Sequence, residues 1–512
     1  MLTTDSQLVR NAKIYPDALT EEYFNWMLII NSKIVAIGSD NEPVVDKKNI
    51  IDMSGNIILP GFIDAHTHFI GLIEDQITVQ LGECKSKKEA IKKLVEGLQN
   101  LNNKAKWLVA YGWDDSLWGN EGYLTREELD QISMEIPIIA LRVCGHIASF
   151  NSLGLETVVL PEDLGSGYIE KDKKSQKPTG VMVDVFFHRE QFYNQEDYVK
   201  SLPLACKHLN KLGITSINDV TEKSIFGLLF EAEKQELLSV RLWMNIPQKD
   251  FKIIKELEIP GGFGSNYLKY NGVKLFLDGS LGGYSSWLKE NYKGKDTKGI
   301  QLISDEQLEA QFREIMASKL NIMAHAIGDA AIDQFLRIYK KIIKNYPNHG
   351  RRDRIEHAEV INEQQIKDCK QLNVSLSMQP NFMIRWGGPR QLYEQRIGEK
   401  RTNLLNNFKM AFKNKLLFFG SDGMPYNPLY GIKGAVLHPN SAYRLTPREA
   451  TFVYTTGNSY ALLAEKEIGR LEVGKQADFI VIEKEPWNVK PEKIDEIRIL
   501  ETYVNGKLVF KL

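Results

Sequence analysis

Residues 61–68 read Gly-Phe-Ile-Asp-Ala-His-Thr-His, an apolar run that ends in two histidines. Residues two apart in a β-strand face the same side, so we expect His66 and His68 to present both imidazoles to one face. A polar strand end is the alternative interpretation of such a pair. The preceding Leu59-Pro60 and the β-type segment before it favour a pair of metal ligands at the end of a barrel strand.

Apolar, strand-like runs alternate with helical patterns along most of the chain, as in parallel βα units. Two of the helical patterns lie at residues 329–345, where Asp329 could cap the first turn, and at residues 362–371. Eight strands are the number that a closed (β/α)8 TIM barrel requires, so we predict this α/β fold. The strands are expected near residues 57–69, 214–219, 240–246, 273–277, 322–325, 354–357, 374–378 and 416–420.

The two ends of the chain consist of short strands and turns. Residues 26–38 predict a hairpin around Asn31-Ser32, and residues 501–510 predict a second hairpin around Asn505-Gly506. Because isolated hairpins are marginally stable, we expect both ends to pair into one small β-domain. Its predicted extent is residues 1–57 together with 467–512.

A long interval separates the first predicted barrel strand from the second. Residues 74–199 far exceed a βα loop of about two to six residues, so they predict an inserted α/β subdomain over the barrel mouth. The barrel itself would comprise residues 58–73 and 200–466. Within the insertion we expect a helix at 87–101 and strands at 107–111 and 138–143.

Composition narrows the classes of function. Hydrophobic residues make up 43% of the 512 residues and the formal net charge is −1, which gives no field to attract nucleic acid or an anionic membrane. The four cysteines are scattered, no apolar run approaches the ~20 residues of a membrane span, and Met1–Asp5 shows no signal-peptide start. We expect a cytoplasmic protein with a small-molecule substrate. The protein could also form a homo-oligomer.

Four further polar residues stand near the ends of predicted barrel strands: Lys274, His325, His357 and Asp422. The C-terminal ends of barrel strands meet at one rim, so these side chains should converge with His66 and His68. Nitrogen and carboxylate donors of this kind suit zinc or a similar divalent ion. Asp422 would follow the last strand, beside the first, and could accept a proton from a metal-bound water.

Each of these four residues has an ordinary alternative. Lys274 could reach the rim or pair with Asp278, although a neutral amine could also add carbon dioxide to form a carbamate. A single histidine at a strand end is more often a core or loop residue than a ligand, and Ser421-Asp422-Gly423 is common turn chemistry. The recurrence at successive strand ends favours one metal centre.

The chain resembles the amidohydrolase superfamily, and within it the YtcJ-like, or amidohydrolase family 3, proteins that include N-substituted formamide deformylases. The resemblance runs from end to end. The segments that carry it are residues 61–68, 112–114, 145–152, 273–282, 325–329, 355–359, 420–425 and 468–478.

The resemblance implies a distorted (β/α)8 barrel with a β-sandwich built from both termini. It also implies two divalent ions, typically zinc: His66, His68 and Asp422 would hold one, His325 and His357 the other, and carboxylated Lys274 would lie between them. His146 of the insertion would contact the substrate and stabilise the oxyanion, and Trp113 and Asp114 are further candidate substrate contacts.

The expected function is metal-dependent hydrolysis of a non-peptide C–N bond, such as that of an N-substituted formamide, by a metal-activated hydroxide. Asp422 and His146 are the expected catalytic residues. One alternative is a single-metal deaminase or lactonase of the same superfamily with unmodified Lys274. A metal-free binding protein on the same barrel is another alternative, and all six intact ligand positions argue against it.

Overall fold

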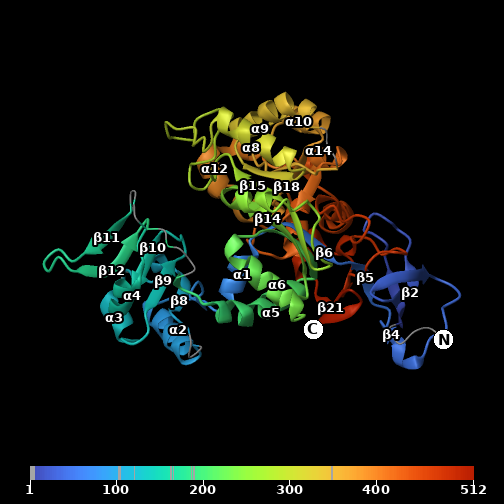
Figure 1. Cartoon of the computed structure of the whole chain (residues 1–512), viewed down its shortest axis with the longest axis horizontal. Helices are drawn as coiled ribbons and strands as arrows, with labels where there is room; N and C mark the ends of the chain where they lie inside the picture. The colour runs from blue at the N-terminus through green and yellow to red at the C-terminus, as the bar shows by residue number, and fades with distance from the viewer. Residues whose placement is uncertain are drawn as a thin grey trace. The chain divides into compact units, whose positions relative to one another are not determined.

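The predicted barrel strands form one parallel sheet in chain order in a computed structural model of the chain (Figure 1). The structure describes residues 6–512 except 102–104, 120, 162–163, 165–166, 186, 188–190 and 347–349. Met1–Asp5, on which the expectation of no signal peptide rests, therefore lie outside the described residues. The barrel strands are β6 (Phe62–Thr67), β13 (Ile214–Val220), β14 (Arg241–Pro247), β15 (Leu268–Phe276), β16 (Asn321–Ala326), β17 (Arg354–His357), β18 (Ser375–Met378) and β19 (Leu417–Phe419).

The predicted boundaries of the first barrel strand were wrong. The single strand expected at residues 57–69 is divided at Gly61 into β5 (Ile57–Pro60), which belongs to another sheet, and the barrel strand β6. A Cβ at Gly61 would lie 2.3 Å from Thr215 Cγ2, so only glycine lets the chain pass this side chain as it changes sheets. An unbroken apolar pattern cannot reveal such a change of sheet.

The barrel closes between its first and last strands, β6 and β19, through a side chain. Asn458 is fully buried, and its amide nitrogen donates to Ile63 O of β6 at 2.6 Å and to Phe419 O of β19 at 2.7 Å. Its amide oxygen accepts from Phe419 N at 3.0 Å. Backbone groups that a barrel seam would leave unpaired are thereby satisfied.

Helices follow most barrel strands (Figure 1). The prediction that Asp329 caps its helix was wrong: the N-cap is Gly328, and Asp329 Oδ1 instead accepts from Lys289 N at 2.9 Å. The predicted helix at 362–371 is confirmed within a residue at each end, with Asn362 as its cap. The helices of the barrel and its rim are α6 (Phe226–Lys234), α7 (Phe251–Glu256), α8 (Asp305–Ala317), α9 (Asp329–Ile342), α10 (Glu363–Leu372), α11 (Pro380–Trp386), α12 (Leu392–Ile397), α13 (Glu399–Thr402), α14 (Phe408–Lys413), α15 (Pro428–Val436), α16 (Pro447–Phe452) and α17 (Asn458–Ala461).

Both chain ends form one β-domain, as predicted. The two hairpin turns have left-handed backbone at Asn31-Ser32 and at Asn505-Gly506, which suits two-residue hairpin loops. Strands β20 and β5 pair antiparallel and so join C-terminal to N-terminal strands. The strands are β1 (Ser6–Ile14), β2 (Phe24–Ile30), β3 (Lys33–Gly38), β4 (Ile50–Asp52), β5, β20 (Phe479–Ile482), β21 (Ile499–Val504) and β22 (Lys507–Lys511).

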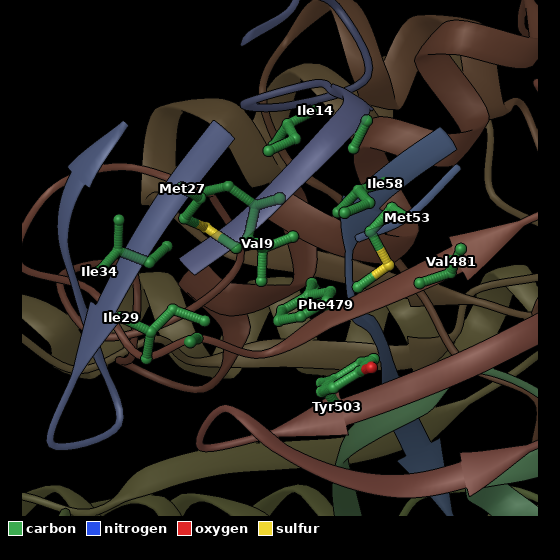
Figure 2. Packing of buried hydrophobic residues seen from close by; sticks show 13 residues of the cluster. Val9, Ile14, Met27, Ile29, Ile34, Met53, Ile58, Phe479, Val481 and Tyr503 are labelled. Carbon is green, nitrogen blue, oxygen red and sulfur yellow. The ribbon is translucent and has the colours of Figure 1, made fainter. Parts of the chain in front are cut away.

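One apolar cluster of this β-domain joins strands from both chain ends. Figure 2 shows Phe479 and Tyr503 of the C-terminal strands in the same cluster as Val9, Met27 and Ile29 of the N-terminal strands. The rings of Phe479 and Tyr503 stack with centroids 4.3 Å apart. Neither end could bury this apolar surface alone, which explains why both ends fold as one domain.

Residues 70–205 form a separate compact unit, Ile70–Ala205, and the remainder of the chain forms the other. The helix and two strands expected in this insertion are confirmed as α2, β8 and β9, with shifted ends. No helix in the described part of the chain has both the length and the apolar sequence that a membrane crossing requires. The unit contains β7 (Val79–Gln80), β8 (Leu108–Trp113), β9 (Ile138–Arg142), β10 (Ile147–Phe150), β11 (Tyr168–Lys171), β12 (Pro178–Val183), α2 (Lys87–Gln99), α3 (Arg126–Asp130) and α4 (Ser152–Thr157), and the unit boundaries fall inside α1 (Phe69–Asp75) and at α5 (Gln195–Lys211).

A buried ion pair joins the barrel to the terminal β-domain. Arg241 at the start of β14 and Asp478 just before β20 are 2% and 3% exposed. Arg241 donates through Nε to Asp478 Oδ2 at 2.6 Å and through Nη2 to Asp478 Oδ1 at 3.0 Å. This bidentate geometry offsets the cost of burying both charges.

Replacing Asp478 by alanine should lower the free energy of unfolding by about 3 kcal/mol, because it leaves the guanidinium buried without its counter-ion. Urea denaturation followed by tryptophan fluorescence measures the change. The control is Glu314→Ala, which removes one partner of the half-exposed pair with Lys255 and should cost less than about 1 kcal/mol. Equal effects of the two substitutions would contradict a stabilising role for the buried pair.

Candidate metal centre

Three of the candidate ligands, His66, His68 and Asp422, meet at the end of β6 and in the turn after β19. Asp422 Oδ1 lies 3.0 Å from His68 Nε2 and 3.4 Å from His66 Nε2. One ligand atom from each of the three residues lies within 4.8 Å of the others. Donors of one ion at bond lengths of about 2 Å are separated by distances of this order, so the three fit a single divalent cation.

The other three donors complete the cluster from neighbouring strands. Lys274 Nζ of β15 lies 3.3 Å from His66 Nε2. The ring centroids of His325 and His357 are 4.4 Å apart, and those of His66 and His357 are 5.0 Å apart. The structure therefore brings all six sequence-predicted ligands together at the C-terminal rim, and Lys274 lies beside the first group of donors.

Backbone conformation explains how β17 can offer two polar residues in succession. Alternation along a strand would send Glu356 and His357 to opposite faces. His357 and Ala358 instead have φ of 71° and 49°, a left-handed conformation that is uncommon for residues other than glycine. The strand therefore turns at His357, and both side chains face the donor cluster. Such local strain is typical of functional sites.

Glu356 was given no role from the sequence, yet it holds the first histidine. Its Oε2 lies 2.5 Å from His66 Nδ1, and the carboxylate is completely buried. Glu356 Oε1 accepts from Arg354 Nε, and Arg354 also donates to Ala65 O at 3.0 Å. A proton on His66 Nδ1 leaves Nε2 available to bind an ion. The signal in the sequence was a pair of opposite charges, Arg354 and Glu356, at alternate positions of an otherwise apolar strand.

The two later histidines are oriented in the same way by uncharged groups. His357 Nδ1 lies 2.8 Å from Gln379 Oε1, which leaves Nε2 free to bind an ion. His325 Nε2 donates to Gly279 O at 3.1 Å, which leaves Nδ1 free. Asp278, the alternative partner considered for Lys274, accepts the backbone N–H groups of Ile327 and Gly328 instead. It thus fixes the rim loop beside His325.

Electrostatics keep the donors in the states that a metal needs. Burial, and then Lys274, lowers the pKa of His325 to about 4, and burial and His325 lower the pKa of His357 well below its usual value. Burial disfavours the ionised form of Asp422, but hydrogen bonds with His66 and His68 outweigh it and hold the pKa of this carboxyl well below its usual range. The site thus offers two neutral imidazoles, those of His325 and His357, and the carboxylate of Asp422.

The pKa shifts of His66 and Lys274 favour a bound cation and a neutral amine, respectively. Burial and Lys274 disfavour charge on His66, yet Glu356 and Asp422 outweigh them and raise its pKa. The field that favours a proton on this ring also favours a metal cation. Burial lowers the pKa of Lys274 to about 8, against the opposing effect of Glu356 and Asp422, so the neutral amine is accessible near neutral pH.

The expected substrate contacts lie in the inserted unit. His146 Nδ1 is 2.8 Å from Asp184 Oδ1, and the imidazole is exposed. Asp114 pairs with Arg142 at 3.1 Å. Trp113 is fully buried in the core of this unit, and its indole N–H donates to Ala140 O at 2.9 Å, so its observed role is packing. Contact of these residues with a substrate stays a prediction.

Known proteins are similar to this chain over most of its length. The sequence model of the amidohydrolase family matches residues 49–510. The Bacillus subtilis protein named "Putative amidohydrolase YtcJ" is 27% identical over 501 residues that cover 90% of each protein. The N-substituted formamide deformylase of Arthrobacter pascens is 24% identical over 526 residues, 95% of this chain and 94% of that protein. An uncharacterized metal-dependent hydrolase from Pyrococcus furiosus has a TM-score of 0.79 at 25% identity, and the match covers 94% of this chain and 100% of that chain.

Replacing Glu356 by alanine should weaken metal binding about 10- to 100-fold, because His66 loses the acceptor that fixes its tautomer. Glu356→Gln keeps an acceptor and should weaken binding less. Competition with a chromophoric chelator measures the affinity, and Glu236→Gln, a change at an exposed turn, is the control. Wild-type affinity in Glu356→Ala would contradict the orienting role.

Proposed function

The chain belongs to the amidohydrolase family, and from this premise we propose that it hydrolyses a non-peptide C–N bond in a small amide. N-substituted formamides are the first class to test, because one relative of nearly the same length is a deformylase of such compounds. The observation that carries the proposal is the placement of Asp422 against both His66 and His68 at the barrel rim. A small neutral substrate also suits a chain with a net charge of −1.

The proposed cofactor is a pair of divalent ions, with zinc as the expected metal. His66, His68 and Asp422 would hold one ion, and His325 and His357 would hold the other. Lys274, carboxylated on Nζ, would supply an oxygen to each. When bound, such ions activate a water molecule and polarise a carbonyl.

In the proposed reaction, Asp422 moves the proton. Its pKa is held well below the usual range, so the carboxylate is ionised. It is the base proposed to accept a proton from the attacking water. A C–O bond then forms at the substrate carbon and the C–N bond breaks. Asp422 returns the proton to the departing nitrogen, and the products are a carboxylic acid and an amine. His146 is proposed to stabilise the charge that develops on the carbonyl oxygen.

Replacing Asp422 by asparagine should lower kcat about 10³-fold, because the amide cannot accept the proton. Zinc-loaded protein would be assayed for formate and amine release from N-substituted formamides, with small amides, lactones and cyclic imides as further substrates. Asp40→Asn, at an exposed position of the terminal β-domain, is the matched control. Undiminished turnover by Asp422→Asn would contradict the assigned role, and turnover of lactones alone would contradict the proposed bond class.

Replacing Lys274 by alanine should reduce the bound metal from about two ions to about one per chain, because the second ion loses its bridging donor. Inductively coupled plasma mass spectrometry of protein purified without chelators counts the ions. Lys252→Ala on α7, whose side chain is 85% exposed, should keep the wild-type count. A count of one in the wild-type protein would instead favour a mononuclear site with unmodified Lys274.

A further inference from the structure

One aromatic side chain, Phe276, lies beside two of the candidate metal ligands. Lys274 and Phe276 are two residues apart on β15, so both face the barrel interior, with Phe276 nearer the rim. Leu275 and Leu277, on the opposite face, are 2% and 0% exposed, which is the burial expected of side chains directed outward under the barrel helices. Phe276 is 47% exposed. Its open surface therefore belongs to the mouth of the barrel.

Phe276 touches two of the six donors. Its ring centroid lies 5.2 Å from Lys274 Nζ and 5.4 Å from the His325 ring. Phe276 and His325 are also direct partners in the β15–β16 ladder, and Leu277 N donates to His325 O at 3.0 Å just beyond them. Backbone pairing thus fixes the main chain on both sides of the ring.

We propose that Phe276 determines specificity by receiving an apolar, preferentially aromatic, substituent on the nitrogen of the substrate amide. This inference rests on the proposed function. In a formamide the acyl carbon carries only hydrogen, so the nitrogen substituent is the group large enough to reach the ring. Aromatic rings in contact bury apolar area and gain from offset or edge-to-face geometry. A single exposed apolar residue is ordinary on a protein surface, but this one contacts two of the candidate metal ligands.

Two metal-chelating probes test the inference without knowledge of the true substrate. N-methyl-N-hydroxyformamide and N-benzyl-N-hydroxyformamide share the chelating group and differ only in the nitrogen substituent. Isothermal titration calorimetry of zinc-loaded protein gives the ratio of their Kd values. We expect the benzyl compound to bind about tenfold more tightly to the wild-type protein. In Phe276→Ala this ratio should fall to about twofold, and Phe276→Leu should give an intermediate ratio.

The matched control is Phe230→Ala on α6, which removes an equally exposed phenylalanine, 49% against 47%, from the helical layer outside the barrel. It should keep the wild-type ratio, and bound zinc is counted in every variant. Two results would overturn the role of Phe276 alone. One is equal affinity of the wild-type protein for the methyl and benzyl compounds, and the other is an unchanged ratio of Kd values in Phe276→Ala. Failure of both compounds to bind zinc-loaded wild-type protein would overturn the proposed function itself.

Discussion

The close approach of the first and last barrel strands is the constraint on which the site depends. A Cβ at Gly420 would lie 2.5 Å from His66 Cβ and 2.6 Å from His66 N, so only glycine allows the end of β19 to reach β6. Directly after this contact, Asp422 N donates to His66 O at 2.9 Å. Asp64 Oδ1 accepts from Ser421 N at 2.9 Å and from His66 N at 3.1 Å. These contacts beside the seam between β6 and β19 therefore also place the carboxylate of Asp422 beside two imidazoles.

The sequence was sufficient to predict the residues that define the barrel and its rim. All eight strands follow from the alternation of apolar runs with helical patterns. Polar residues at the ends of those runs identified the six candidate ligands, which the structure brings together. The division at Gly61 was not predictable, because both halves are equally apolar and only the packing of Thr215 separates them. The prediction that Asp329 caps its helix was wrong for a similar reason. Its carboxylate accepts a hydrogen bond from the backbone N–H of Lys289, which is distant in sequence.

Residues that orient the donors were harder to find than the donors themselves. Glu356, Gln379 and the carbonyl of Gly279 act on a histidine of another strand or loop, so their roles depend on strand register and on the turn at His357. A one-residue change in register would reverse the faces of these side chains. Residue type and local spacing do not determine that register. Opposite charges at Arg354 and Glu356 in a buried strand were the one clue available beforehand.

Charge balance links the proposed lysine modification to metal binding. With Lys274 as an ammonium, the charges of buried Lys274, Arg354 and Glu356 and of mostly buried Asp422 cancel. Conversion of Lys274 to a carbamate exchanges a positive for a negative charge and leaves this set with a net charge of −2, which is costly in a buried site unless cations compensate it. Divalent ions would supply that compensation, and the carbamate would in turn supply their oxygen ligands. Each step thus favours the other, so modification and metal loading are expected to occur together.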